Sequence, residues 1–217
     1  MHATMPVCRR CGRCCRQGGP SLCRDDLPLV ASGPLGPHRL LTLRRGECVT
    51  DNVAGGVAPL AAELVKVRPV PGGRACVFFR APDACAVHAD RPRQCRLLYC
   101  AAPEAVRATY ARDRLTRRDI LAPDDPLAAL CAQHEAETDL TRLAGLCRRT
   151  LAGDGAAREE VARLVRLDAA YRELLPARAG LPPEALPFYL GRPLAQALPA
   201  CRAALAPAAL YKPRSSA

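Results

Sequence analysis

The uneven distribution of cysteine constrains this chain of 217 residues more than any other feature. Of its 13 cysteines, only Cys131, Cys147 and Cys201 lie beyond residue 100. No apolar leader follows Met1, and no apolar run reaches the roughly 18 residues that a membrane-spanning helix needs. We therefore expect a cytoplasmic protein without membrane contact, in which reduced thiols bind metal rather than form disulfides.

The composition changes near residue 101, where the cysteine-rich segment ends. Residues 1–101 are rich in Gly and Pro, whereas residues 102–217 are rich in Ala, Leu, Arg and Glu. We predict an α+β protein with a loop-rich, metal-stapled N-terminal half that contains short strands. This cysteine-cluster domain, residues 1–101, precedes a mainly α-helical domain, residues 102–217, that packs on it.

Local patterns predict the elements of each half. Strands are expected at 39–43, 63–70 and 74–79, and the turn residues Pro71-Gly72-Gly73 predict a hairpin between the last two. Helices are expected at 103–115, 126–150 and 156–175, with Asp124 or Asp125 as an N-cap. Beyond Pro182, prolines 187, 193 and 199 predict short helical pieces.

The strongest chemical signal is Cys8-x2-Cys11-x2-Cys14-Cys15. Two intervening residues allow a tight turn to direct two sulfurs at one ion, at metal–sulfur distances of about 2.3 Å. The first three cysteines have the spacing of a bacterial ferredoxin cluster, but Cys15 follows where a ferredoxin has a spacer. A second set supplies further thiols: Cys76, Cys85, Cys95 and Cys100. These eight suffice for two four-thiolate sites, or for one site with spare thiols.

The same residues resemble the cysteine-cluster family named for its CxxCxxCC motif, also called YkgJ-like. The resemblance covers residues 8–100, through the four N-terminal cysteines and a second set of positions: Cys76, Phe78, Cys85, Arg91, Pro92, Cys95, Arg96, Tyr99 and Cys100. It departs from the family with Phe79, Val87 and His88, where His88 is an additional candidate ligand or hydrogen-bond donor. The resemblance implies a zinc- or iron-chelating domain and assigns no function to the helical half.

Arginines accompany the candidate ligands. Arg9, Arg10, Arg13, Arg16 and Arg93 flank them, and Arg91 and Arg96 belong to the family motif. Their positive charge would lower thiol pKa values and offset the negative charge of a thiolate centre. The alternative is an arginine-rich surface without a role at the site. Because the chain has a net charge of +11 but only 4% aromatic residues and no block of five like charges, nucleic acid is the less favoured partner.

The remaining candidates have simpler structural interpretations. Cys23, Cys48, Cys147 and Cys201 are expected to be ordinary small residues. Cys131 and His134 lie three apart on one helix, and a helix–helix contact explains His134 better than a metal site does. Asp25 and Asp26 could orient a ligand loop, but a helix N-cap is the simpler role. No phosphate-binding glycine motif, nucleophile elbow or catalytic triad is found in the sequence.

Three functions remain open at this point. The first is a protein that binds an iron–sulfur cluster, slightly favoured, or Zn²⁺, with a structural, redox or electron-transfer role and with a protein partner left open. The second is a methyl-transfer enzyme or its accessory subunit, because flagellin lysine methylases carry a similar cysteine segment; the missing glycine-rich turn opposes it. The third is a zinc-ribbon-like module that binds nucleic acid or protein.

Overall fold

The computed structural model describes residues 8, 10–51, 53, 55–99 and 102–205. Short elements fill the N-terminal half. They are α1 Arg13–Arg16, η1 Arg24–Asp26, α2 Leu27–Ala31, η2 Pro37–Arg39, β1 Leu40–Leu43, β2 Cys48–Thr50, β3 Val57–Pro59, β4 Leu64–Val67, β5 Phe79–Arg80, β6 Ala84–Cys85 and α3 Arg93–Leu97, where η marks a 3₁₀-helix. The predicted loop-rich half with short strands is confirmed.

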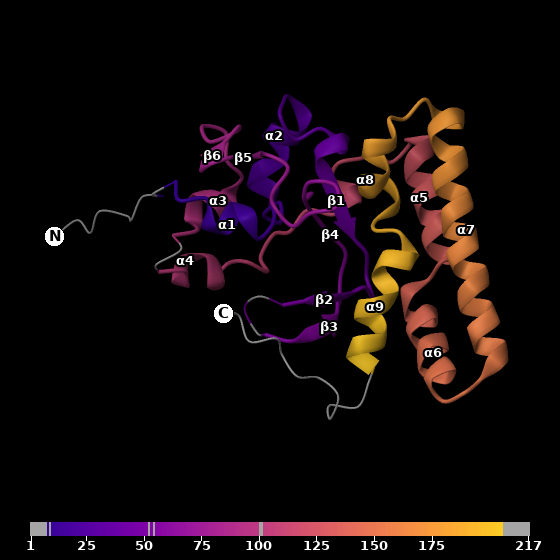
Figure 1. The fold of residues 1–217 in the computed structure, drawn as a ribbon. Helices are drawn as coiled ribbons and strands as arrows, with labels where there is room; N and C mark the ends of the chain where they lie inside the picture. The colour runs from indigo at the N-terminus through magenta and orange to yellow at the C-terminus, as the bar shows by residue number, and fades with distance from the viewer. Residues whose placement is uncertain (1–7, 9, 52, 54, 100–101, 206–217) are drawn as a thin grey trace.

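Longer helices follow in the second half. The elements are α4 Glu104–Arg107, η3 Arg117–Asp119, α5 Pro126–Glu137, α6 Leu140–Leu151, α7 Gly155–Ala179, η4 Pro183–Ala185, α8 Leu186–Leu190 and α9 Leu194–Leu205. In Figure 1, α5, α6 and α7 form one end of the molecule and α1, α3, β5 and β6 the other, with β1, β4, α8 and α9 between them. The chain is therefore α+β, as predicted. Among the described residues, no helix is long and apolar enough to cross a bilayer.

Strand pairing differs from the predicted hairpin. β4 pairs antiparallel with β1, from Leu40 opposite Val67 to Leu43 opposite Leu64. The Pro71-Gly72-Gly73 turn does form, but it joins only a single bridge between Pro69 and Cys76. The strand predicted at 74–79 is wrong, because the backbone turns again where the Phe79 amide donates to the Cys76 carbonyl. Within this segment, only Phe79 belongs to a strand: it begins β5, which pairs with β6.

Several predicted helices need correction. The helix predicted at 126–150 is two helices, because the Asp139 carboxylate caps α6 by accepting from the Arg142 amide. The predicted helix at 103–115 is reduced to the single turn α4. Pro176 and Pro199 lie inside α7 and α9 rather than ending them. The helix at 156–175 and the Asp125 cap, which accepts from the Leu127 amide, are confirmed.

The hydrophobic core draws on both halves of the chain. One cluster joins Leu22, Leu40 and Val65 to Phe188 and Leu190, all fully buried. A second cluster lies between α6, α7 and α9 and includes Cys48 from β2. The two halves therefore share their apolar interior, and the division at residue 101 does not separate two independent cores.

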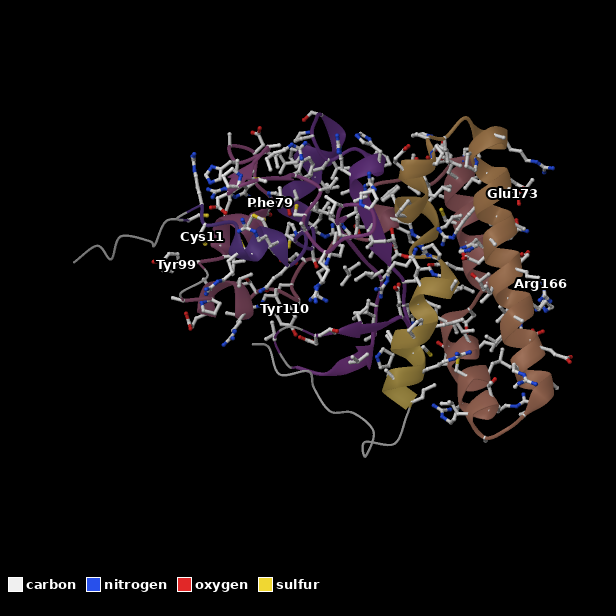
Figure 2. The ribbon with its side chains drawn as sticks, in the orientation of Figure 1. Cys11, Phe79, Tyr99, Tyr110, Arg166 and Glu173 are labelled. Atoms are coloured by element: carbon white, nitrogen blue, oxygen red, sulfur yellow. The ribbon has the colours of Figure 1, made fainter. Side chains whose placement is uncertain are left out.

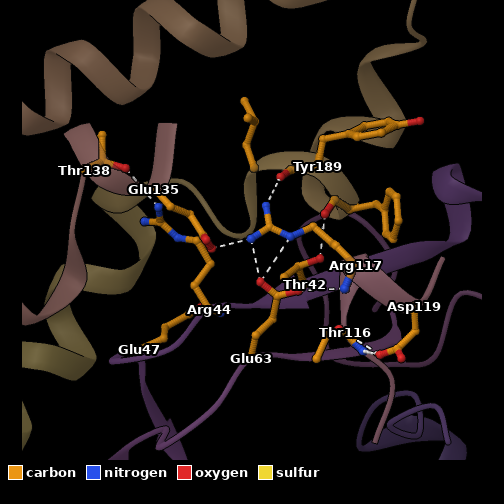
Figure 3. Close-up of polar contacts among 12 residues, drawn as sticks. Thr42, Arg44, Glu47, Glu63, Thr116, Arg117, Asp119, Glu135, Thr138 and Tyr189 are labelled. Atoms are coloured by element: carbon orange, nitrogen blue, oxygen red, sulfur yellow. Dashed lines mark hydrogen bonds and ion pairs between the residues drawn. The ribbon is translucent and has the colours of Figure 1, made fainter. Parts of the chain in front are cut away.

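A buried ionic network also connects the two halves (Figure 3). The Arg117 guanidinium, 4% exposed, donates to the Glu63 carboxylate and to Glu135 on α5. It also donates to the backbone carbonyl of Tyr189 on α8. These hydrogen bonds and charges raise the pKa of Arg117, although burial opposes them. The network satisfies a charge that would otherwise be costly to bury between the sheet and the helices.

Candidate metal centre

Three segments that are distant in the sequence bring cysteines to one end of the molecule. The first is α1, where Gly12 precedes the helix with φ 67° and the Sγ atoms of Cys14 and Cys15 lie 4.0 Å apart. The Cys76 amide donates to the Cys15 carbonyl at 2.7 Å, which fixes the second segment beside the first. Figure 2 shows Cys11, Phe79 and Tyr99 close to this end, far from Arg166 and Glu173 on α7.

The β5–β6 hairpin packs against α1. Phe79 pairs with Cys85 in this hairpin, and the Arg16 guanidinium lies 4.8 Å from the centre of the Phe79 ring. Arg16 also pairs with Asp83 at 2.8 Å. A Cβ at Gly12 would lie 2.8 Å from the Asp83 carboxylate and 2.9 Å from the Phe79 ring. The close approach therefore requires glycine at this point of the cysteine motif.

Asp26 positions the third segment, α3, which carries Cys95. Its side chain is fully buried and accepts from two backbone amides, that of Cys23 at 2.9 Å and that of Arg93 at 2.7 Å. The predicted N-cap role is wrong in detail: Asp26 is the third residue of η1, where its side chain completes a capping box with Cys23, and it makes no side-chain cap to α2. The second bond also fixes the start of α3 and, through it, the position of Cys95. Gln94 adds a further connection, since its Oε1 accepts from the Ser21 amide.

Thiol electrostatics place Cys14, Cys15, Cys76, Cys85 and Cys95 in one neighbourhood. The pKa of Cys15 is raised by its hydrogen bond with Cys14, by burial, and by the charges of Cys14, Cys95 and Cys85. Burial raises the pKa of Cys95, and the charges of Cys76, Cys14 and Cys85 add to this effect. Burial likewise raises the pKa of Cys76, with a contribution from Cys85. Each ionised thiol thus disfavours ionisation of its neighbours, a repulsion that a cation would relieve.

The other predicted ligands are placed differently. Cys8 is partly exposed and Cys11 is exposed. The Arg10 amide donates a hydrogen bond to the Cys8 sulfur at 3.4 Å. Cys100 lies outside the described residues. Within the described ranges, no group of three or more His, Cys, Asp or Glu side chains is arranged to hold a metal ion. The donor chemistry fits a thiolate centre, although the described side chains do not gather as three or more ligands around one point.

Two of the predicted arginines contact the segment next to Cys85. Arg91 lies 2.9 Å from Nε2 of His88, and Arg10 lies 3.3 Å from Nδ1 of the same ring. Burial, and then the charges of Arg91 and Arg10, lower the pKa of His88, so its ring is neutral near pH 7. The Arg91 charge also opposes the rise in the pKa of Cys95. Arg96 donates to the Arg91 carbonyl at 2.6 Å and so orders the loop.

The structure also joins cysteines that the sequence treats as ordinary. Cys48 on β2, Cys147 on α6 and Cys201 on α9 lie in one buried cluster. No sequence spacing indicates this cluster, because its members come from three elements that meet only in the folded chain. His134 is fully buried and bonds to Asp168 on α7 at 2.9 Å, which is the predicted helix–helix contact.

Comparisons with known proteins add no relative. No family model matches the chain, and neither the curated proteins nor the solved structures contain a match. The resemblance to the CxxCxxCC family therefore stays a prediction based on the quoted residues.

Proposed function

We propose that residues 8–100 bind a metal centre through cysteine thiolates, in a cytoplasmic protein. One observation carries the proposal: thiols on α1, the Cys76–Cys85 segment and α3 lie near enough for the charges of neighbouring thiols to raise the pKa values of Cys15, Cys76 and Cys95. The Sγ atoms of Cys14 and Cys15 are 4.0 Å apart. Clustered thiols of this kind are soft donors that select zinc or iron–sulfur centres. Cys8, Cys11 and Cys100 are the further donors that the sequence motif supplies.

An iron–sulfur cluster is slightly favoured over Zn²⁺, because of the double two-residue spacing and the number of sulfurs. Such a centre supplies electron transfer or redox sensing when bound, whereas zinc supplies structural cross-linking. Around it, the chain's own residues have separable roles. Asp26 holds α3 in place, Gly12 lets the cysteine turn approach Asp83, and Arg91 adds positive charge beside Cys95.

Anaerobic purification followed by analysis of iron, zinc and acid-labile sulfide tests the proposal. A brown protein with absorbance near 400 nm and sulfide matching its iron indicates an iron–sulfur cluster; a colourless protein with stoichiometric zinc indicates a structural centre. We expect Cys95→Ser to lose most of the metal, and Cys201→Ser, the matched control remote from the cluster, to retain it. Full metal content in both Cys11→Ser and Cys95→Ser, or no bound metal in the unaltered protein, contradicts the proposal.

A further inference from the structure

The cluster of Cys48, Cys147 and Cys201 lies in the second hydrophobic core, away from the N-terminal motif. The exposed fractions are 6% for Cys48, 1% for Cys147 and 6% for Cys201. α9, which carries Cys201, contacts both β2 with Cys48 and α6 with Cys147, and it lies between them in Figure 1. All three side chains belong to one buried cluster, and Cys147 and Cys48 both raise the pKa of Cys201.

We propose that Cys147 and Cys201 form a redox-active dithiol that peroxide oxidises to an intramolecular disulfide between α6 and α9. The roles of the two sulfurs follow from their partners. Cys147 is the attacking sulfur, because Cys201 and the positive charge of Arg202 favour its thiolate and lower its pKa. Cys201 is the resolving sulfur, because it is the thiol in contact with the attacking one. Cys48 is a spectator that keeps its proton.

Charge and solvation support this assignment. The hydrogen bond from Cys201 and then the Arg202 charge lower the pKa of Cys147, against the effect of burial. The pKa of Cys201 is raised, first by its hydrogen bond with Cys147 and then by burial. Burial also raises the pKa of Cys48, which faces Glu47 as well as Cys147. One thiolate beside one retained thiol is the arrangement that two-step thiol oxidation needs.

The reaction balances with hydrogen peroxide as the oxidant. The Cys147 thiolate attacks one peroxide oxygen, the O–O bond breaks, and hydroxide leaves, which gives a sulfenic acid at Cys147. The Cys201 sulfur then attacks the Cys147 sulfur, the S–O bond breaks, and water leaves with the Cys201 proton. A solvent proton converts the hydroxide to water. Two thiols lose two electrons in total, and peroxide is reduced to two water molecules.

Access to the buried sulfurs has a local explanation. Pro199 lies inside α9, two residues before Cys201. Proline has no amide hydrogen, so α9 lacks one helical hydrogen bond at this point and opens there at a lower free energy than an uninterrupted helix. Peroxide is little larger than water and needs only such a local opening.

Peptide-resolved thiol counting tests the proposal on the full chain. Trypsin places the three sulfurs on separate peptides, 46–66, 143–148 and 179–202, because Arg192 precedes proline and is not cleaved. The native protein is treated with peroxide, quenched in acid and alkylated with one maleimide, then reduced and alkylated with a second, isotopically heavier one. We expect heavy label to appear together on Cys147 and Cys201, and a cross-linked 143–148/179–202 peptide before reduction. Cys48 should keep the light label.

Variants separate the roles of the three sulfurs. Cys48→Ser should retain the cross-link, whereas Cys201→Ser should abolish it and leave a sulfenic acid at Cys147 that dimedone traps. We expect Cys147 to react about tenfold faster than Cys131, a buried single thiol whose pKa is raised to about 11 chiefly by burial. A cross-link of Cys201 to Cys48, or a Cys147 that stays reduced while exposed Cys11 is oxidised, overturns the proposal. The wild-type mapping decides this even if a variant does not fold.

Discussion

The two ends of the molecule use cysteine and arginine in opposite ways. At the N-terminal end the cysteines are mostly part-exposed, and arginines such as Arg16, with a half-exposed side chain, bridge loops to the hairpin. In the helical half the cysteines are buried, and Arg117 is a buried arginine whose carboxylate partners Glu63 and Glu135 are partly exposed. At the N-terminal end the thiols are therefore accessible for metal ligation. In the helical half a buried arginine needs a carboxylate partner to offset its charge.

The largest difference between the two ends should appear in their arginines. Replacement of Arg117 by Met removes a buried charge and leaves the largely covered Glu63 carboxylate without its partner, and we expect the free energy of unfolding to fall by about 3 kcal/mol. Arg16→Met is the matched control, and because its ion pair is half exposed we expect a loss of about 1 kcal/mol or less. Urea titration of both variants measures the difference. Equal losses would remove the contrast between the two kinds of arginine.

The buried His134–Asp168 pair predicts a smaller effect that depends on pH. Asp168 also accepts from Arg172 and from the Leu194 amide, and the buried Arg44 adds positive charge near the ring. Burial, against the Asp168 bond, lowers the pKa of His134, so the folded ring stays neutral where the unfolded one binds a proton. Stability from this group is therefore complete above pH 6.5 and is lost as the pH falls below that value.

Replacement of His134 by Leu tests this directly. We expect a loss of about 2 kcal/mol at pH 7, because the Asp168 carboxylate loses one of its buried hydrogen bonds. The variant should also show a shallower fall in unfolding free energy between pH 6.5 and 5. His88, with a pKa shifted in the same direction, is the comparison at the N-terminal end, and His88→Gln should change the slope without the loss at pH 7. An unchanged slope in His134→Leu contradicts the assignment.

The smallest predicted effect concerns the anchor of α3. Asp26→Asn keeps one acceptor oxygen but replaces the other by an amide group, so one of the two backbone amides loses its partner. We expect unfolding to become easier by about 1 kcal/mol. Amide hydrogen exchange at Cys23 and Arg93 locates the loss. Faster exchange spread evenly over both halves, rather than confined to η1 and α3, would show that Asp26 is no local anchor.

Local sequence patterns predicted where helices and strands form better than they predicted which strands pair. The apolar spacing at 156–175 identified α7, and an aspartate followed by proline identified the start of α5. The break between α5 and α6 was missed although it has a local signal, since the Asp139 carboxylate caps α6 by accepting from the Arg142 amide. The β1–β4 pairing was missed because a turn signal says nothing of a distant strand.

The candidate site divides along a similar line. The sequence named all five thiols that interact at the N-terminal end, because each belongs to a cysteine pattern that can be recognised along the chain before the segments are brought together. For Asp26 the sequence left orientation of a ligand loop as the less simple alternative to a cap, and the bond from the Arg93 amide favours that alternative. The sequence could not indicate that Cys48, Cys147 and Cys201 meet, since this depends on how separate elements pack. Metal binding itself stays a prediction for the elemental analysis described above.

The apolar interior shared across residue 101 has a practical consequence. A fragment ending there would expose Leu40 and Val65 to water, because their contacts with Phe188 and Leu190 would be missing. Such a fragment would tend to aggregate even if every sulfur remained in place. Disturbance at the thiol-bearing end should likewise reach the helices, so the molecule should melt in one step rather than two.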